Sequence, residues 1–391
     1  MRLTDTLPKV APDGLPAAVL LSFLATAGLF YVNIMAALVT GLSDGLGIKP
    51  ASAGLIASAN VYGAAVGALI AVFLVRRIPW RIAATSALVG LIAVDLVSTQ
   101  LVSVPGLTVL RACHGMIGGL LVGIAFAVIA RTRSPDRVFG MLLVVQFGIG
   151  GIGLWALPPL VPEYGTGVLF LALAAFSLAT LAMLPFLPAY PVVVESAGAA
   201  EAPPIARKPL AATLAAIFLF QAGNMGLAAF IIGLGRGAGL SQDFIGPTLA
   251  AANWLGAVGS ILVVAMGARF GRARPILGSI AVTLIFTAAF WRSDLPAVYV
   301  AANIGSAIVW AFTIPYLLGL AAAFDKVGRT AALGGFCSKL GLASGPLLTG
   351  LLLDRGGYPL TIVAAVLLLL ASGLAAAWPA RLLDRAQPSQ A

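Results

Sequence analysis

The sequence predicts an all-α integral membrane protein, with twelve transmembrane helices arranged as two six-helix bundles. Three observations support this fold class. Of the 391 residues, 61% are hydrophobic and only 9% are charged, and the mean hydropathy is +1.06. Soluble domains carry about 25% charged residues, so this chain has too few charges to cover soluble domains. The apolar runs are long and continuous, and one polar stretch divides them into two sets of six.

The apolar runs have the length that a membrane-spanning helix needs, about 20 residues. Only helices and closed barrels satisfy all their backbone hydrogen bonds inside lipid, and the runs lack the alternation of apolar and polar residues that barrel strands show. In chain order, we expect spans at 16–41, 52–75, 82–102, 105–130, 137–161, 166–187, 209–234, 244–267, 275–292, 296–322, 331–353 and 359–379.

Residues 188–208 contain prolines and charged residues among alanines, a composition typical of a linker. The sequence therefore predicts three parts: an N-terminal six-helix bundle at 1–187, a cytoplasmic linker at 188–208 and a C-terminal six-helix bundle at 209–391.

The chain has 23 lysines and arginines and a formal net charge of +10. With the spans placed as above, most of these cations fall at the two ends of the chain and in the loops that follow even-numbered spans. The positive-inside rule then predicts a multi-pass protein of the inner (plasma) membrane with both termini in the cytoplasm. Because the cations are explained by topology, they do not indicate nucleic-acid binding.

The two halves match at a constant offset, at which Asn60 and Gly63 correspond to Asn253 and Gly256. Each half has six spans, so both halves have the same orientation in the membrane. Such a repeat implies a pseudo-two-fold axis along the membrane normal and a binding site near the midplane between the halves. This plan suits alternating access by rocking of the halves.

The layout resembles that of major facilitator superfamily transporters over nearly the whole chain. That family has a loop pattern, G-x-L-x-D-R-x-G-R-R, after its second helix, and degraded copies without the aspartate stand at 74–81 and 267–272. Residues 111–115 are similar to the family's R-x-x-x-G pattern. The overall appearance is closest to the drug and small-metabolite proton antiporters, although their G-x-x-x-G-P motif occurs here at 341–346 rather than in the fifth helix.

Few ionisable residues lie inside the predicted spans, and each is a functional hypothesis because a charge at bilayer depth is costly. A helix rises about 1.5 Å per residue, which puts Asp95 and Arg111 both roughly 10 Å below the outer membrane surface. They lie on consecutive antiparallel spans, so we expect an ion pair. We favour a structural clip between the two spans over a proton switch in which protonation of Asp95 frees Arg111.

His114 follows Arg111 by three residues, on nearly the same helix face. Histidine titrates near physiological pH, so His114 can carry a coupling proton or hydrogen-bond a substrate. The alternative interpretation is a neutral side chain that a neighbouring helix satisfies.

Lys339 lies about 10 to 15 Å into the span 331–353 from its cytoplasmic end. Its repeat equivalent is Gln146, and polar residues at equivalent places in both halves indicate a central site. The alternative is that Lys339 snorkels to the inner surface. With Arg111 and His114, Lys339 makes the predicted cavity cationic, which favours an anionic or carboxylate-bearing substrate.

Asn33 and Asn224 lie on the first and seventh spans, which occupy equivalent places in the two halves, so the two side chains can face each other. The alternative role is hydrogen bonding between helices, worth about 0.6 kcal/mol on average. The candidate substrate-binding or proton-coupling residues are therefore Arg111, His114, Lys339, Gln146, Asp95, Asn33 and Asn224.

We expect no catalytic residues, no metal and no cofactor. Residues 148–153 match G-x-G-x-x-G, but a dinucleotide site needs a preceding strand, a following helix and a downstream acid. Glycines in membrane spans, such as those at 63–67 and 115–119, instead allow close helix packing. One histidine and two cysteines cannot build a common zinc site, and no Walker motif is present. The chain is therefore not expected to be an enzyme.

The sequence thus predicts a secondary active transporter that exports a small organic molecule by alternating access, coupled to protons. Its expected partners are that molecule, protons and the lipid bilayer, and we expect it to function as a monomer. An alternative is an importer of an organic anion that Lys339 and Arg111 bind. An alternative of another class is a non-transporting membrane receptor or scaffold, which leaves the buried charges unexplained.

Overall fold

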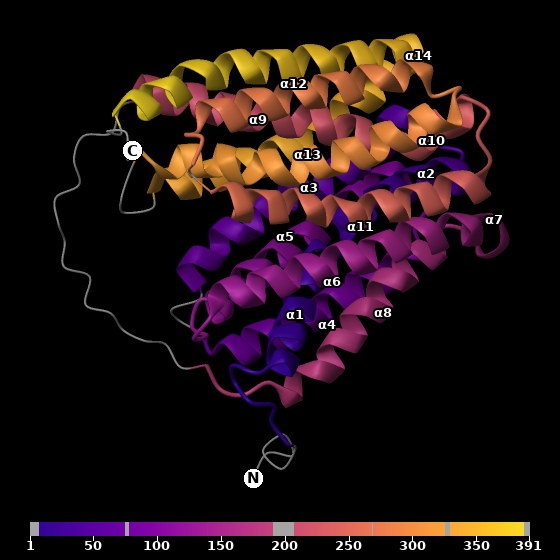
Figure 1. The fold of residues 1–391 in the computed structure, drawn as a ribbon. Helices are drawn as coiled ribbons and strands as arrows, with labels where there is room; N and C mark the ends of the chain where they lie inside the picture. The colour runs from indigo at the N-terminus through magenta and orange to yellow at the C-terminus, as the bar shows by residue number, and fades with distance from the viewer. Residues whose placement is uncertain (1–7, 75–77, 191–206, 268, 325–328, 387–391) are drawn as a thin grey trace. The chain divides into compact units, whose positions relative to one another are not determined.

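The computed structural model describes residues 8–74, 78–190, 207–267, 269–324 and 329–386, and all regular elements in these ranges are helical (Figure 1). Within these described ranges, eleven helices are long and apolar enough to cross a membrane. The last of these, Thr330–Arg385, consists of two helices that meet at the non-helical Gly357. Counting its two parts separately gives the twelve predicted spans, and the all-α membrane fold is confirmed.

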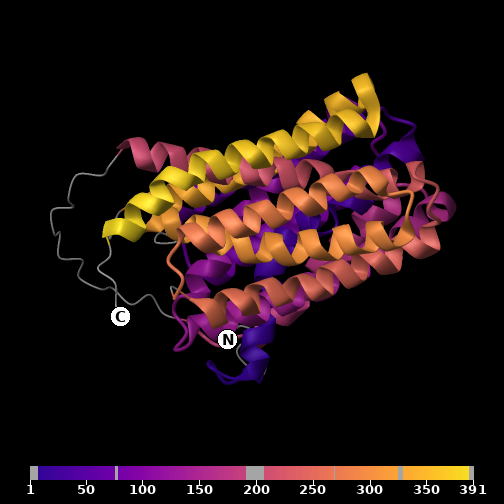
Figure 2. The same ribbon diagram turned by 45° about the horizontal axis from the view of Figure 1, so that its top comes forward.

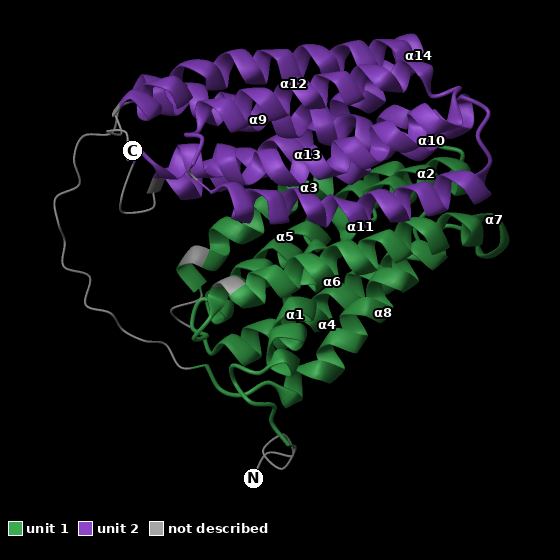
Figure 3. Ribbon diagram, in the orientation of Figure 1, with its two compact units in different colours: residues 1–48, 59–197 green, residues 49–58, 198–391 purple. Residues whose placement is uncertain are grey.

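The chain forms two compact units (Figure 3). Residues 1–48 and 59–197 make up the first unit, and residues 49–58 and 198–391 make up the second. The bundle boundaries predicted from the sequence stay predictions, and most of the predicted linker 188–208 lies outside the described residues.

In the first unit, α1 packs against α5, α6 and α8, and α4 packs against α5 and α8. Prolines at the first positions of α1, α5 and α6 favour helix initiation, because a residue there has no backbone N–H bond to lose. The helices of this unit, to which α3 contributes from residue 59 onward, are α1 (Leu15–Asn33), α2 (Met35–Leu46), α3 (Pro50–Leu74), α4 (Trp80–Ser98), α5 (Val104–Ile129), α6 (Pro135–Ala156), η2 (Pro158–Leu160), α7 (Val161–Tyr164), α8 (Gly167–Met183) and η3 (Leu184–Phe186).

Glycines bring α3 and α5 into backbone contact. A Cβ atom on Gly63 would collide with the carbonyl oxygen of Ala112, and one on Gly115 would collide with the carbonyl oxygen of Asn60. The predicted role of these glycines in close helix packing is therefore confirmed. The contact fixes the backbone of Asn60 directly beside α5.

In the second unit, α14 packs along α9 and α12, and α13 packs against α11 and α12. Figures 1 and 2 both show α14, in yellow, beside α9 and α12. The helices of this unit are α9 (Arg207–Ala229), α10 (Ile231–Gly237), α11 (Gln242–Met266), α12 (Ala273–Ala289), η4 (Phe290–Arg292), α13 (Pro296–Ala322) and α14 (Arg329–Ala386).

The first and seventh predicted spans, 16–41 and 209–234, are each broken, which corrects the expectation of one continuous helix. The breaks fall at Ile34, with φ −109° and ψ 18°, and at Phe230, with φ −111° and ψ 13°. Both residues lie near the sparsely populated bridge region, outside the helical well. Neither is a proline or glycine, so the sequence carries no local sign of either break.

The start of α12 is capped by a side chain from the end of α14. Asp384 accepts hydrogen bonds from the backbone N–H groups of Arg272 at 2.8 Å and Ala273 at 2.9 Å. The neighbouring Gly271 has φ 68°, and a Cβ atom there would lie 2.8 to 3.0 Å from the Asp384 carboxylate. The loop copy at 267–272 has no aspartate of its own, and Asp384 supplies a carboxylate to it from another helix.

Candidate functional site

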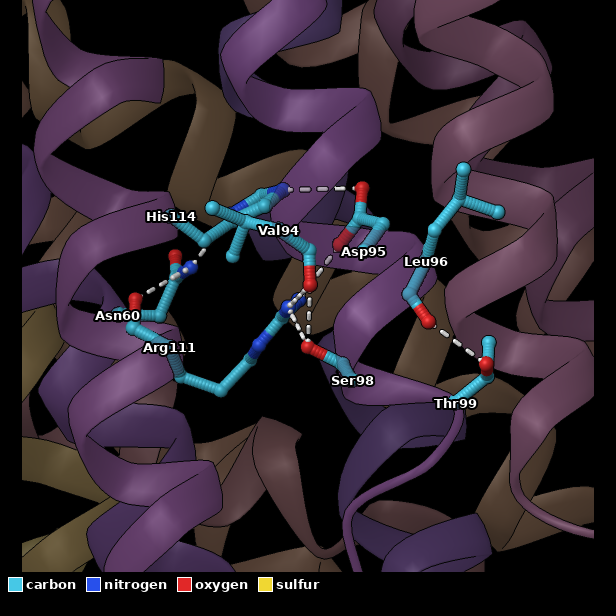
Figure 4. Close-up of polar contacts among 8 residues, drawn as sticks. All are labelled: Asn60, Val94, Asp95, Leu96, Ser98, Thr99, Arg111 and His114. Carbon is cyan, nitrogen blue, oxygen red and sulfur yellow. Dashed lines mark hydrogen bonds and ion pairs between the residues drawn. The ribbon is translucent and has the colours of Figure 1, made fainter.

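Asp95 on α4 and Arg111 on α5 form the ion pair expected from their depths (Figure 4). Arg111 Nη1 lies 2.8 Å from Asp95 Oδ1, and both side chains have 0% of their surface exposed. Asp95 is one helical turn from the end of α4 and Arg111 is two turns from the start of α5, so the antiparallel hairpin brings them to the same level.

The guanidinium of Arg111 is enclosed on its other sides as well. Its Nη2 donates hydrogen bonds to the hydroxyl of Ser98 and, at 3.4 Å, to the carbonyl oxygen of Val94. Its Cζ lies 4.8 Å from the ring centroid of Phe170 on α8. Sequence reasoning missed Ser98, which lies one turn from Asp95 and so faces the same neighbour. Arg111 therefore ties α5 to α4.

The carboxylate of Asp95 is shared between two residues. Its second oxygen, Oδ2, lies 3.3 Å from His114 Nε2, and His114 is only 4% exposed. One turn of α5 thus directs both Arg111 and His114 at the same carboxylate, as Figure 4 shows. This arrangement combines the clip with a group that can gain a proton.

Asn60 on α3 completes the site, although sequence reasoning singled it out only as a repeated residue. Its Nδ2 lies 2.8 Å from His114 Nδ1 and 3.2 Å from the carbonyl oxygen of Arg111, and Asn60 is 2% exposed. Its repeat equivalent, Asn253, donates to the Leu249 carbonyl of its own helix at 3.2 Å. A polar residue at a repeated position in an apolar span was the signal available for Asn60.

The polar groups of the site are not all satisfied. Arg111 Nε and the Tyr31 hydroxyl are buried and have no hydrogen-bond partner among the described residues, and Asp95 Oδ2 makes no hydrogen bond of normal geometry beyond its 3.3 Å contact with His114 Nε2. The Tyr31 ring lies 5.8 Å from the His114 ring, centroid to centroid. A buried unsatisfied polar atom costs about 1–3 kcal/mol, and such atoms call for an explanation in a native fold. A purely structural clip between α4 and α5 gives no reason for the unpaired Arg111 Nε and Tyr31 hydroxyl.

The net charge of the site depends on a single proton. With His114 neutral, Asp95 and Arg111 cancel each other. A proton added to His114 or to Asp95 leaves one uncompensated positive charge in a region of low dielectric constant, which is energetically costly.

A second polar pair of the first unit joins α1 and α6. Gln146 Nε2 donates to Asn33 Oδ1 at 2.9 Å, and Asn33 Nδ2 lies 3.5 Å from the backbone oxygen of Gln146. In the second unit, Asn224 donates to the Phe220 carbonyl of its own helix at 2.8 Å. The facing of Asn33 and Asn224 stays a prediction.

Lys339 on α14 is half-buried, and no hydrogen bond or ion pair joins it to another described residue. The turn that carries it is held by its neighbour Ser338, whose hydroxyl accepts from Gln221 Nε2 at 2.7 Å. Gln221 Oε1 in turn accepts from Trp310 Nε1 at 2.9 Å. The backbone beside Lys339 is thus fixed by three helices, while its ammonium group has no described partner.

Comparison with known proteins gives matches among solved structures only. No known family model matches the chain, and no curated protein matches it. The nucleoside transporter NupG superimposes with a TM-score of 0.72 at 13% identity, over 94% of this chain and 98% of that one. A point mutant of NupG gives a TM-score of 0.74 at 13% identity, over 92% and 97%.

A third structure is a bacterial homolog of the human lysosomal transporter Spinster, in an inward-facing and unoccupied conformation. It superimposes with a TM-score of 0.67 at 16% identity, over 97% of this chain and the whole of that one. At these identities the likeness establishes the fold. The chain has an all-α, multi-pass membrane fold like that of these three structures.

Proposed function

We propose that this chain is a secondary active transporter that moves a small organic molecule by alternating access, coupled to protons, with export as its direction. The fold and the internal repeat support alternating access. The resemblance to drug and small-metabolite proton antiporters supports export. We further propose that the protein lies in the inner membrane with both termini in the cytoplasm and that a monomer is functional.

The observation that carries proton coupling is the shared carboxylate of Asp95. Chains of acidic residues and histidines inside membrane spans are typical of proton relays in pumps and transporters. Here Asp95 and His114 are the two proton carriers, 3.3 Å apart, and Arg111 is the fixed counter-charge. Protonation of either carrier weakens the hold of Asp95 on Arg111, which links proton binding to the contact between α4 and α5.

Lys339 supports the second candidate, import of an organic anion. A half-buried ammonium without a described partner is a suitable counter-charge for a carboxylate. Arg111 was the other expected anion ligand, but here it is enclosed by Asp95, Ser98 and Phe170. The anion candidate therefore depends on Lys339.

A thermal-shift screen of the purified protein distinguishes the candidates. The probes are benzoate as a carboxylate, tetraphenylphosphonium as a lipophilic cation and uridine as a nucleoside, the last because NupG is a nucleoside transporter. Lys339→Ala is compared with wild type, and Arg355→Ala, which removes an exposed cation from the same helix, is the matched control.

One result is that benzoate stabilises wild type and Arg355→Ala but not Lys339→Ala. This result supports the anion importer and contradicts a substrate that does not contact Lys339. Equal stabilisation of all three proteins by uridine or tetraphenylphosphonium supports the first proposal and excludes Lys339 as a ligand. Absence of any shift with all probes contradicts both proposals for these substrate classes and favours a receptor or scaffold.

A further inference from the structure

We propose that Asn60 is a positioning residue that holds His114 in its neutral form, with the proton on Nε2, and that the Asn60 amide must reverse before His114 can accept a second proton. This inference rests on the proposed function only where it links the amide to proton coupling. The tautomer of His114 and the role of the Asn60 amide follow from the arrangement of donors and acceptors at the imidazole.

The two ring nitrogens of His114 face groups of opposite character. Nε2 faces the Asp95 carboxylate oxygen at 3.3 Å, which accepts hydrogen bonds only. Nδ1 faces the amide nitrogen of Asn60 at 2.8 Å, which donates hydrogen bonds only. The proton therefore belongs on Nε2, and Nδ1 must be the unprotonated acceptor.

The orientation of the Asn60 amide is fixed by a second contact. The same Nδ2 donates to the carbonyl oxygen of Arg111 at 3.2 Å. If the amide were reversed, Oδ1 would face this carbonyl oxygen, and two acceptors would be placed together. The hydrogen bond from α3 to α5 and the neutral state of His114 are thus two results of one amide orientation.

A second proton on Nδ1 requires an acceptor at the place that Asn60 Nδ2 now occupies. Reversal of the amide supplies one, at the expense of the bond to the Arg111 carbonyl. The backbone of Asn60 cannot move away easily, because Gly115 of α5 lies directly against its carbonyl group. The side chain is therefore the movable part of this contact.

The groups that face His114 determine which helix contacts its protonation affects. Asp95 comes from α4, Asn60 from α3, and Tyr31 from α1, while Arg111 shares α5 with the histidine. A doubly protonated imidazole competes with Arg111 for the single carboxylate. Protonation thereby loosens two contacts of α5 together, one with α3 and one with α4.

The test uses the fact that the chain contains one histidine. The protein is labelled with ¹⁵N-histidine, purified on a tag without histidine and placed in lipid nanodiscs. Long-range ¹H–¹⁵N correlation spectra then report the protonation of both imidazole nitrogens without any assignment. For wild type at neutral pH we expect a neutral ring with its proton on Nε2.

Two variants test whether Asn60 determines the protonation state of His114. Asn60→Asp places acceptor oxygens at Nδ1, so we expect the affinity of His114 for a second proton to rise about tenfold or more. Asn60→Leu removes the donor to Nδ1, so the Nδ1 signal should move to that of an imidazole nitrogen without a hydrogen bond, while the Asp95 carboxylate still favours the proton on Nε2. The matched control, Asn253→Leu at the repeat position, should give the wild-type spectrum.

A wild-type ring protonated on Nδ1 overturns the inference, and so does an Asn60→Asp spectrum identical to wild type. The wild-type spectrum alone decides the tautomer if a variant does not fold. The readout needs no substrate. Failure of the proposed function would appear as absence of probe binding and transport with the imidazole spectra unchanged.

Discussion

Asp95 and Arg111 form an ion pair of 2.8 Å with no solvent exposure of either side chain, yet the second oxygen of the Asp95 carboxylate is left to His114. The geometry fits the structural clip that the sequence favoured, and the proton switch stays a prediction. The pair ties α4 to α5, and it places a titratable group on the same carboxylate.

Removal of one member of this pair should destabilise the protein strongly. Arg111→Met leaves a buried carboxylate, and Asp95→Leu leaves a buried guanidinium, so each should cost about 3–5 kcal/mol of unfolding free energy. The double variant leaves neither charge and should recover most of that loss. The unfolding free energies of wild type and the three variants, measured in detergent, complete this double-mutant cycle. A double variant less stable than both single variants would contradict the pairing.

Alanine at Gly115 should weaken the contact between α3 and α5. The new methyl group would collide with the Asn60 carbonyl oxygen, and overpacking of this kind costs about 1–3 kcal/mol. Gly140→Ala on α6 is the control, because nothing lies within 4 Å of a Cβ atom there. The melting temperatures of both variants check this. Equal melting temperatures of Gly115→Ala and Gly140→Ala would show that α3 and α5 can move apart without loss of stability.

Asp384→Ala should lower stability by about 1 kcal/mol, because it removes the acceptor of two N–H groups at the start of α12. The control is Asp294→Ala. Asp294 is exposed and bonded to Arg292 at 3.1 Å, and the hydrogen bond from Arg292 lowers the pKa of its carboxyl group. Exposed pairs contribute little to stability, so the melting temperature of this control should not change. An equal loss in both variants would argue against the cap.

Tyr190 should make the first unit sensitive to alkali. Burial, with a smaller contribution from Asp13, raises the pKa of Tyr190 to about 12, while Arg81 opposes the rise. The neutral hydroxyl, which donates to the Pro12 carbonyl at 2.9 Å, is therefore favoured by the fold. Because the folded pKa lies above the unfolded value, this stabilisation is complete below about pH 10 and is lost between about pH 10 and 12.

Tyr190→Phe, which lacks the hydroxyl, should be less stable than wild type at neutral pH and should lose less stability over that interval. Melting temperatures measured from pH 8 to 12 in both proteins check this. Parallel curves would contradict a role for this hydroxyl.

The sequence was sufficient for the spans and for the main charge pair. Depth along a helix is fixed by its rise, so Asp95 and Arg111 could be placed at one level from their positions alone. Close packing by Gly63 and Gly115 followed from small residues in apolar spans. These features depend on spacing along single helices.

The sequence did not reveal features that depend on which helices are neighbours. Asn60 belongs to the site because α3 lies against α5, a contact between helices that are not consecutive in the chain. The breaks at Ile34 and Phe230 carry no proline or glycine. Asp384 lies far along the chain from the loop that it caps.

The most direct test of the account is proton movement by the reconstituted protein. Liposomes containing a pH-sensitive dye are given a gradient of uridine, benzoate or tetraphenylphosphonium, and wild type is compared with Asp95→Asn and with the control Asp294→Asn. We expect at least one probe to move protons through wild type and the control, and Asp95→Asn to bind that probe without moving protons. Equal proton flux in Asp95→Asn and wild type, or no flux with any probe, would contradict the claim that this buried carboxylate couples transport to protons.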